Sequence, residues 1–348
     1  MKNIVRKRLI TIFLIFCGIV GAILYYFFFT PLSKSKETVY VYIDDDDDID
    51  SVYTKLSPLS SKHGLNAFRT MVRHSSYSDN IRSGRYAIES NDGAFMVFRH
   101  MKNGQQTPVR LTIPSVRTID RLCGEIAKRM MMDSLQLYKT LTNNEKISSF
   151  GYDTATIACM FIPNTYELYW NIPIEKFLER MKKESDNFWN EERRSKANAM
   201  RLLPNEVITL ASIVDEETAV DSEKPMVAGM YYNRLMLRSS EYPQGMPLQA
   251  DPTIKFALKR FDLKRIYNAM LYINSPYNTY RNVGLPPGPI RIPTIAGIDA
   301  VLNYTRHNYL YMCAKEDLSG THNFATTYQE HQQNAKRYSD ALNRIGIK

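Results

Sequence analysis

The sequence predicts an α+β protein whose folded part follows a single N-terminal transmembrane helix. Three observations lead to this prediction. A run without charge at residues 9–29 follows four basic residues. Short runs rich in β-branched and aromatic residues then alternate with helical patterns between residues 38 and 115. Amphipathic helical patterns dominate the next hundred residues, so the second part of the chain is expected to be mainly helical.

Composition excludes several classes of protein. The chain has 348 residues, enough for about two domains. Its 44% hydrophobic and 23% charged residues exclude a wholly disordered chain. The net charge of +9 is a weak excess once the basic N-terminus is set aside, which argues against nucleic-acid binding. The four cysteines form no CxxC pair, and HExxH and GxSxG motifs are absent, which disfavours zinc, thioredoxin-like, metalloprotease and serine-hydrolase functions. We expect no cofactor and no metal ion.

Residues 9–29 are predicted to be an uncleaved transmembrane helix. Such a helix is about 31 Å long, close to the hydrocarbon thickness of about 30 Å. The alternative is a cleaved signal peptide, whose apolar core is usually about 7–15 residues and ends at small residues. Here the run ends in five aromatic residues, which suit a membrane interface. The positive-inside rule places residues 1–8 in the cytoplasm and the chain beyond the anchor outside the plasma (inner) membrane.

Residues 30–37 are predicted to be a short polar linker, and residues 38–115 a small α+β module. The expected strands are residues 38–43, 84–88 and 109–113, and the expected helices are residues 66–74 and 95–101. Five consecutive aspartates, residues 44–48, are interpreted as a solvated turn whose last member caps a helix starting near Ile49. The run lacks the central Gly and the later Glu of a calcium loop.

Beyond residue 115 the sequence predicts helices at residues 118–131 and 174–200. The second alternates basic and acidic residues and is interpreted as a solvated amphipathic helix. After Leu237 the chain is rich in Pro, Asn and Tyr and has few long periodic runs. Long irregular segments in compact domains are usually functional, so this region is expected to contribute to a site.

A helix predicted over residues 204–218, with Asn205 as its cap, carries an acid on its apolar side. At about 100° per residue, the apolar stripe is centred near Leu210, and Glu217 falls inside it while Asp215 falls on its boundary. The opposite face carries the polar residues Thr209, Ser212 and Glu216.

Glu217 is therefore a candidate general acid. Burial raises the pKa of a carboxyl group, and a raised pKa suits proton donation near neutral pH. Two structural interpretations stay open at this point. Glu217 could lie beyond the last buried turn, or it could pair with an arginine such as Arg234.

Several ordered blocks of sequence resemble the endolytic murein transglycosylase family (MltG, also called YceG-like). The string LASIVDEET at residues 210–218 resembles the catalytic helix of that family. The resemblance covers nearly all of the chain after the anchor. The other blocks are FIPNTY at 161–166, NRL at 233–235, LQADPT at 248–253, SPYNTY at 275–280, GLPPGPI at 284–290, and a C-terminal group with Tyr309, Tyr311, His322, Phe324, Tyr328 and His331.

The resemblance implies a LysM-like module at residues 38–115 and a mixed α/β catalytic domain at residues 116–348. It implies cleavage of the β-1,4 bond between N-acetylmuramic acid and N-acetylglucosamine inside glycan strands, giving 1,6-anhydro ends. Peptidoglycan strands are then the substrate, and peptidoglycan synthases are the expected partners, whose nascent strands the enzyme would trim. The attacking group is the C6 hydroxyl of the substrate itself, so one carboxyl group can act first as acid and then as base.

The resemblance places the catalytic carboxyl at Glu217. The family usually has Glu where this chain has Asp215, which leaves the part played by Asp215 open. The expected substrate-binding residues are Asn233, Gln249, Asn278, Tyr280 and Asp215. Asp251 is expected to orient a neighbour or cap a helix, Tyr277 and Tyr280 to stack on sugars or pack in the core, and His322 and His331 to be structural or to line the cleft.

Two other functions remain as alternatives. One is a non-catalytic, membrane-anchored scaffold that only binds the cell wall. The other is a hydrolase on the same scaffold, which would need a second carboxylate beside Glu217. The candidates for that second group are Asp215, Asp251 and Glu330.

Overall fold

The computed structural model describes residues 2–263 and 265–344 and shows a mixed α+β architecture with two compact units. Within these residues the strands form three separate two-stranded sheets, in the orders β1–β2, β3–β4 and β5–β6. The first unit holds the described residues up to Leu111 with Arg129–Met132 and Tyr166–Ile172, and the second holds Thr112–Lys128, Asp133–Thr165 and the described residues from Pro173 onward.

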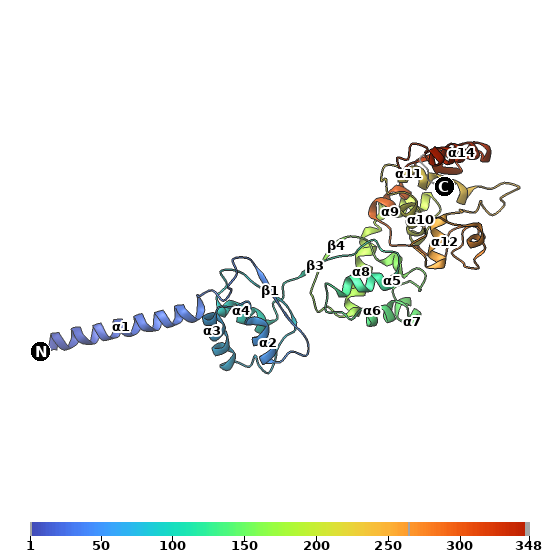
Figure 1. Ribbon diagram of the computed structural model, residues 1–348. Helices are drawn as coiled ribbons and strands as arrows, with labels where there is room; N and C mark the ends of the chain where they lie inside the picture. The colour runs from blue at the N-terminus through green and yellow to red at the C-terminus, as the bar shows by residue number, and fades with distance from the viewer. Residues whose placement is uncertain (1, 264, 345–348) are drawn as a thin grey trace. The chain divides into compact units, whose positions relative to one another are not determined.

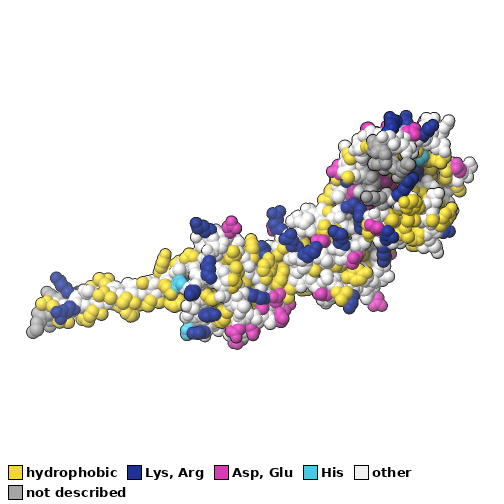
Figure 2. Space-filling model, in the orientation of Figure 1, with side chains coloured by type: hydrophobic (Ala, Val, Ile, Leu, Met, Phe, Trp, Pro, Cys, Tyr) yellow, Lys and Arg dark blue, Asp and Glu magenta, His cyan; other side chains and the backbone are white. Residues whose placement is uncertain are grey.

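Helix α1 (Lys2–Phe28) contains one apolar span, Ile4–Phe27, with a mean hydropathy of 2.4 and no buried residues. Its length and composition are those of a helix that can cross a membrane. Figure 2 shows apolar side chains along this helix and basic side chains towards its N-terminal end. The structure therefore agrees with the predicted anchor in length and apolar character.

The first unit continues with a β-α-α-β arrangement and a further helix (Figure 1). Strand β1 pairs with β2 in antiparallel register, and the alternating side chains of β1 place Val41 and Ile43 in the core while Tyr40 and Tyr42 stay exposed. The elements are β1 (Val39–Ile43), α2 (Ile49–Leu56), α3 (Lys62–Arg73), β2 (Gly84–Ile88), α4 (Ala94–Asn103) and β3 (Val109–Thr112).

Two details of this unit differ from expectation and one agrees. Asp48 caps α2 by accepting a hydrogen bond from the Ser51 N–H at 2.8 Å, as predicted. Helix α3 starts at Lys62, four residues earlier than predicted, because Ser61 caps it. The segment 30–37 is not a free linker, since Leu32 is fully buried in the core of this unit.

The second unit is mainly helical. Its strands are short and lie between helices, so the sheets contribute little to its core. The elements are α5 (Ile119–Ala127), α6 (Ser134–Leu141), α7 (Asn144–Ser148), η1 (Ile157–Met160), β4 (Thr165–Leu168, shared with the first unit), α8 (Ile174–Phe188), α9 (Glu191–Ala199), α10 (Pro204–Glu217), α11 (Lys224–Met236), α12 (Asp251–Leu258), η2 (Asn268–Tyr272), α13 (Ile295–Leu302), β5 (Tyr311–Ala314), β6 (His322–Ala325) and α14 (Tyr328–Arg344).

The helix predicted over residues 174–200 is wrong as a single element. The structure has two helices, α8 and α9, separated at Trp189 and Asn190. Asn190 accepts a hydrogen bond from the Arg193 N–H at 3.0 Å and so starts a new helix. The helix predicted over residues 118–131 is also shorter, because α5 ends at Ala127.

Helix α10 forms the centre of the second unit and is buried on all sides. Figure 1 shows it among α9, α11 and α12. Thr209 and Ser212, predicted to lie on a polar face, are 3% and 0% exposed. Their hydroxyls donate to the Asn205 and Thr209 carbonyls, which satisfies them inside the core. The single apolar stripe predicted for this helix is therefore wrong.

The predicted cap of α10 is also wrong. The N-cap is Leu203, Pro204 occupies the first turn, and the Glu206 carboxylate accepts from the Leu203 N–H at 2.7 Å. Asn205 lies inside the first turn, where Pro204 has already fixed the helical backbone.

Candidate active site

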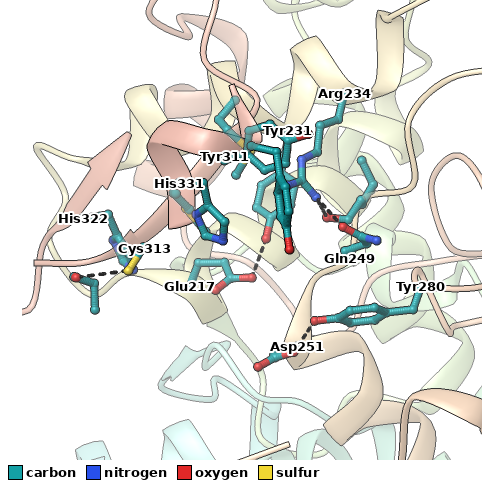
Figure 3. Close-up of a pocket in the computed structure, with 15 residues that line it drawn as sticks. Glu217, Tyr231, Arg234, Gln249, Asp251, Tyr280, Tyr311, Cys313, His322 and His331 are labelled. Carbon is teal, nitrogen blue, oxygen red and sulfur yellow. Dashed lines mark hydrogen bonds between the residues drawn. The ribbon is translucent and has the colours of Figure 1, made fainter. Parts of the chain in front are cut away.

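One pocket of about 340 Å³ lies in the second unit where the end of α10 meets α11, α12, the β5–β6 hairpin and α14 (Figure 3). Its lining combines acids, aromatic rings and imidazoles, a composition suited to a polar ligand with apolar faces. The lining side chains are Glu217, Met230, Tyr231, Arg234, Leu248, Gln249, Asp251, Tyr280, Tyr311, Met312, Cys313, Ala314, His322, Tyr328 and His331.

Glu217 is the last residue of α10 and lines this pocket. The Tyr231 hydroxyl donates a hydrogen bond to its Oε1 at 2.5 Å (Figure 3). Protein atoms surround most of its carboxyl group, and this loss of hydration raises the pKa of Glu217 from 4.5 to about 7. The Tyr231 hydrogen bond opposes the rise, while the negative charge of Asp251 adds to it. Glu217 can therefore hold or release a proton near neutral pH.

The structure does not show an ion pair between Arg234 and Glu217. The Arg234 side chain is buried, and its guanidinium donates to the carbonyls of Leu310 at 2.5 Å and Leu248 at 2.7 Å. It also lies over the Tyr311 ring, 5.3 Å from the centroid. Arg234 thus fixes the pocket wall by tying three segments together, and its charge acts on Glu217 only from a distance.

A second carboxylate, Asp251, lines the same pocket. It is the first residue of α12, and it accepts a hydrogen bond from the Tyr280 hydroxyl at 2.5 Å. It does not cap that helix, because the N-cap is Ala250. Of the two expected roles, orientation of a neighbour is therefore the one that the structure supports.

Gln249 lies two residues before Asp251 in the sequence and has a left-handed backbone conformation, with φ of 52°. Its N–H donates to the Thr279 carbonyl at 3.0 Å, and its side chain lines the pocket. Non-glycine residues in this region of φ are strained, and such strain is concentrated at functional sites. The neighbouring segments thus hold an amide side chain at the pocket.

Two histidines line the pocket from the C-terminal segments. His322 is held by Glu223, whose carboxylate accepts from the His322 N–H at 2.6 Å and contacts Nδ1 at 3.0 Å. His331 instead stacks on Tyr311, with ring centroids 5.5 Å apart, and its buried Nδ1 has no hydrogen-bond partner in the described structure. Burial and the charge of Arg234 lower the pKa of His331, so it presents a neutral ring to the pocket.

Asp215, an expected substrate-binding residue, lies away from this pocket. Its side chain is only 2% exposed and pairs with Lys224 at 2.8 Å. It also accepts a hydrogen bond from the Thr294 N–H at 2.6 Å, at the start of α13. A Cβ atom at Gly297 would overlap the Asp215 carboxylate, so a glycine is needed there. Asp215 therefore joins three helices.

The expected substrate-binding residues Asn233 and Asn278 also point elsewhere. The Asn233 amide donates to the carbonyls of His307 at 2.7 Å and Tyr309 at 3.0 Å. The Asn278 side chain is fully buried and donates to backbone carbonyls of residues 271 and 273. Both amides fix loops, whereas Gln249 and Tyr280 from the same predicted set do line the pocket.

Glu216, between the other two acids, faces a third environment. Its carboxylate pairs with Arg117 at 2.7 Å and Arg291 at 3.1 Å. Three consecutive acids therefore have three different settings, and only Glu217 opens onto the pocket.

Sequence reasoning missed Tyr231 as a member of the site. It precedes the NRL block on α11 by two residues and is 2% exposed, so its pattern in the sequence is that of a core tyrosine. A buried tyrosine hydroxyl needs a hydrogen-bond partner, which is the one signal that could have suggested a polar neighbour.

Tyr277, a candidate for stacking on sugars, packs on Phe256 outside this pocket, with ring centroids 4.8 Å apart.

The geometry defines a class of site: one proton-donating carboxyl group in an open, polar and aromatic pocket whose lining also contains a second carboxylate. Among residues 2–263 and 265–344, no group of three or more His, Cys, Asp or Glu side chains is placed to hold a metal ion. The arrangement can transfer protons to and from a bound ligand.

The chain belongs to the YceG-like family, whose sequence model matches residues 41–337. It is similar to the endolytic murein transglycosylase of Streptococcus pneumoniae serotype 2 (strain D39), with 26% identity over 344 residues, 89% of this chain and 60% of that protein. It is also similar to the endolytic murein transglycosylase of Bacillus subtilis (strain 168), with 26% identity over 332 residues, 90% of this chain and 88% of that protein. The chain thus spans 60% of the length of the pneumococcal relative.

The fold is similar to the crystal structure of a yceG-like protein from Listeria monocytogenes. The TM-score is 0.53 and the identity is 25%, and the match covers 86% of this chain and 99% of that one.

Proposed function

We propose that this chain is a membrane-anchored lytic transglycosylase. It cuts the β-1,4 bond between N-acetylmuramic acid and N-acetylglucosamine inside murein strands and leaves 1,6-anhydro ends. Support comes from the family membership and from two relatives that are named endolytic murein transglycosylases. The observation that carries the proposal is Glu217, a carboxyl group with a pKa of about 7 that lines the pocket.

Glu217 acts twice in this reaction. Its protonated carboxyl donates the proton to the oxygen of the leaving N-acetylglucosamine as the bond from C1 to that oxygen breaks. The resulting carboxylate then takes the proton of the C6 hydroxyl of the muramic acid, whose oxygen bonds to C1 and closes the anhydro ring. The proton count balances, and Glu217 returns to its protonated state. A pKa near 7 suits both steps.

The other pocket residues would bind the sugars. Gln249 and Tyr280 offer an amide and a hydroxyl, which suit acetamido and hydroxyl groups. His331 offers its ring to the pocket, although its Nδ1 atom is buried. Tyr311 offers an aromatic face. Asn233, Asn278 and Asp215, which we expected to contact substrate, would instead act through the loops and helices that they hold.

A hydrolase is the second candidate, because one observation favours it. Of the three carboxylates considered as the second group, only Asp251 lines the pocket with Glu217. Asp215 is paired with Lys224, and Glu330 accepts backbone hydrogen bonds at the start of α14. An inverting or retaining hydrolase would use Asp251 and water and would leave reducing ends.

We further propose that α1 anchors the protein in the plasma membrane with its N-terminus in the cytoplasm and the catalytic unit outside. The β-α-α-β arrangement from β1 to β2 supports the proposal of a LysM-like module within residues 38–115. Tyr40 and Tyr42 are partly exposed on this module, with Arg85 over the Tyr40 ring and Trp170 against the Tyr42 ring. Peptidoglycan synthases are the proposed partners, since they produce the strands that this enzyme would shorten.

The test is product analysis by mass spectrometry after the full-length protein in detergent is incubated with murein. Anhydro ends support the lyase, reducing ends support the hydrolase, and no cleavage supports a binding scaffold. Glu217→Gln should release no product. Glu175→Gln is the matched control, because Glu175 is exposed on α8 and far in sequence from the pocket residues.

A further inference from the structure

Two adjoining hollows in the second unit lie outside the catalytic pocket. Their volumes are about 230 Å³ and 760 Å³, and together they form what we call the α5 groove. The two hollows are continuous because they share much of their lining. The shared residues are Val116, Arg117, Thr118, Asp120, Tyr138, Lys259 and Arg291.

Cations outnumber acids in the α5 groove. Arg117 and Arg291 face it but are partly neutralised by Glu216, which binds both. Arg121 and Lys259 also line it, and neither has a carboxylate partner among the residues that the structure describes. Asp120 is the one acid in its lining. The larger hollow therefore carries unpaired positive charge towards solvent.

The N-terminus of helix α5 adds to the positive electrostatic potential of the groove. Thr118, the N-cap residue, lines both hollows, and its side chain makes no capping hydrogen bond. The Thr118 side chain therefore does not occupy the first N–H groups of this nine-residue helix. A helix N-terminus that coincides with unpaired Arg121 and Lys259 is a setting in which carboxylates or phosphates bind.

The smaller hollow is more apolar. Its lining includes the rings of Phe256 and Tyr277 and the small side chains of Ala155 and Ala158. A groove with an apolar part beside a cationic part suits a short peptide that carries small apolar side chains and free carboxylates. A bare phosphate chain would leave the apolar part unused.

We propose that the α5 groove binds the peptide stem of murein through its free carboxylates, which rests on the proposed function. Murein stems contain alanines and free carboxylates and hang from the muramic acid at the bond to be cut. The groove lies beside the end of α10, the helix that carries Glu217. Glu216, which holds two of its arginines, is adjacent in sequence to Glu217.

Helix α12 gives the distance between the two sites. Asp251 at its start lines the catalytic pocket, and Lys259 just after its end lines the groove. Eight residues of helix span about 12 Å. An extended stem of about four residues spans about 13 Å, a length that matches this separation.

The test compares murein strands that carry stems with the same strands after an amidase has removed them, using the full-length protein in detergent. The double variant Arg121→Glu/Lys259→Glu should lower the ratio of kcat/KM between stem-bearing and bare strands by about tenfold, since charge-assisted contacts are lost and repulsion is introduced. Lys183→Glu, an exposed cation on α8, should keep the wild-type ratio. An unchanged ratio in the double variant overturns the proposal.

A titration with a free stem pentapeptide separates this proposal from the proposed function, because it needs no cleavage. Wild-type protein should bind the peptide with free carboxylates, and the double variant should bind it about tenfold more weakly. Equal binding of a peptide whose carboxylates are amidated, or binding of inorganic phosphate in place of the peptide, overturns the proposal. If wild-type protein binds the peptide but cleaves no strand, the groove stands and the lyase assignment fails. Thermal melts of both variants verify that they fold.

Discussion

Helix α10 ends in three consecutive acids, Asp215, Glu216 and Glu217. These acids serve different regions of the molecule. Asp215 is buried in the interior and Glu216 lies beside the α5 groove, and each has a cationic partner within hydrogen-bond distance. Glu217 lies in the pocket itself, where its close partner is the neutral Tyr231 hydroxyl. The comparison shows that partners, and not residue type or place in the sequence, decide whether a carboxyl group holds the fold or carries a proton.

The largest expected effect on activity comes from a substitution of Glu217, the acid in the pocket. Glu217→Gln keeps the shape of the side chain but cannot give up a proton. Release of anhydro products should fall by about 10³-fold or more, since general acid–base groups contribute about 10²–10⁴-fold. The thermal midpoint should stay at or above that of the wild type at neutral pH. An active Glu217→Gln, or one that is inactive because it has unfolded, would remove Glu217 from the mechanism.

A substitution at the buried acid Asp215 should lower the free energy of unfolding. Asp215→Asn leaves Lys224, which is 6% exposed, with the exposed Asp221 as its remaining ion-pair partner among the described residues. Removing one member of a buried ion pair costs about 3–5 kcal/mol, and the Asp221 contact should reduce this to about 2–3 kcal/mol of unfolding free energy. Urea unfolding measures the loss, and kcat of the folded fraction should stay within about threefold of wild type. A dead enzyme with normal stability would show that Asp215 takes part in the chemistry.

The dependence of stability on pH gives a second contrast. The pKa of Glu217 is raised from 4.5 to about 7 in the folded protein, so the folded state binds this proton more tightly than the unfolded state does. This contribution is fully present below pH 4.5 and is lost as the pH rises through 7. The stability of Glu217→Gln relative to wild type should therefore increase between pH 4.5 and 7, by at most about 3 kcal/mol, and then level off.

Denaturant midpoints across this range would measure that change, with Glu175→Gln as the variant that should follow the wild type at every pH. A constant difference between Glu217→Gln and wild type would show that Glu217 has an ordinary pKa.

The smallest expected effect concerns the hydroxyl beside Glu217. Tyr231→Phe removes a hydrogen bond that lowers the pKa of Glu217, so that pKa should rise further, by about 1 unit for a hydrogen bond of about 1.4 kcal/mol. The alkaline limb of the profile of kcat/KM against pH should move upwards with it. Tyr232→Phe is the control, because the Tyr232 hydroxyl bonds to the Met200 carbonyl and does not contact Glu217. A shift downwards in Tyr231→Phe would contradict the assigned direction of the hydrogen bond.

The sequence predicted best those features that depend on local pattern. The apolar helix, strands β1 and β2 and the Asp48 cap each follow from a short run of residues. It also pointed to Glu217 as an acid in apolar surroundings. The reasoning behind that was incomplete, because α10 is buried on all sides and has no single apolar stripe.

Features set by partners from distant segments could not be predicted. Asn278, Gln249 and Asn233 are all polar amides in the family's motifs, yet only Gln249 lines the pocket. The other two amides meet backbone carbonyls of neighbouring loops. Which amide faces the ligand depends on how the loops after Leu237 fold, and these loops lack the periodicity on which pattern analysis relies.

The contact between Asp215 and Gly297 has a consequence for substitutions at these two positions. Any side chain at 297 would occupy the space of the Asp215 carboxylate, and a longer acid at 215 would need that same space. A side chain at 297 therefore requires the Asp215 carboxylate to move. The free-energy costs of changing the two positions, 82 residues apart in the sequence, are expected to be non-additive, because each substitution alters the space that the other needs.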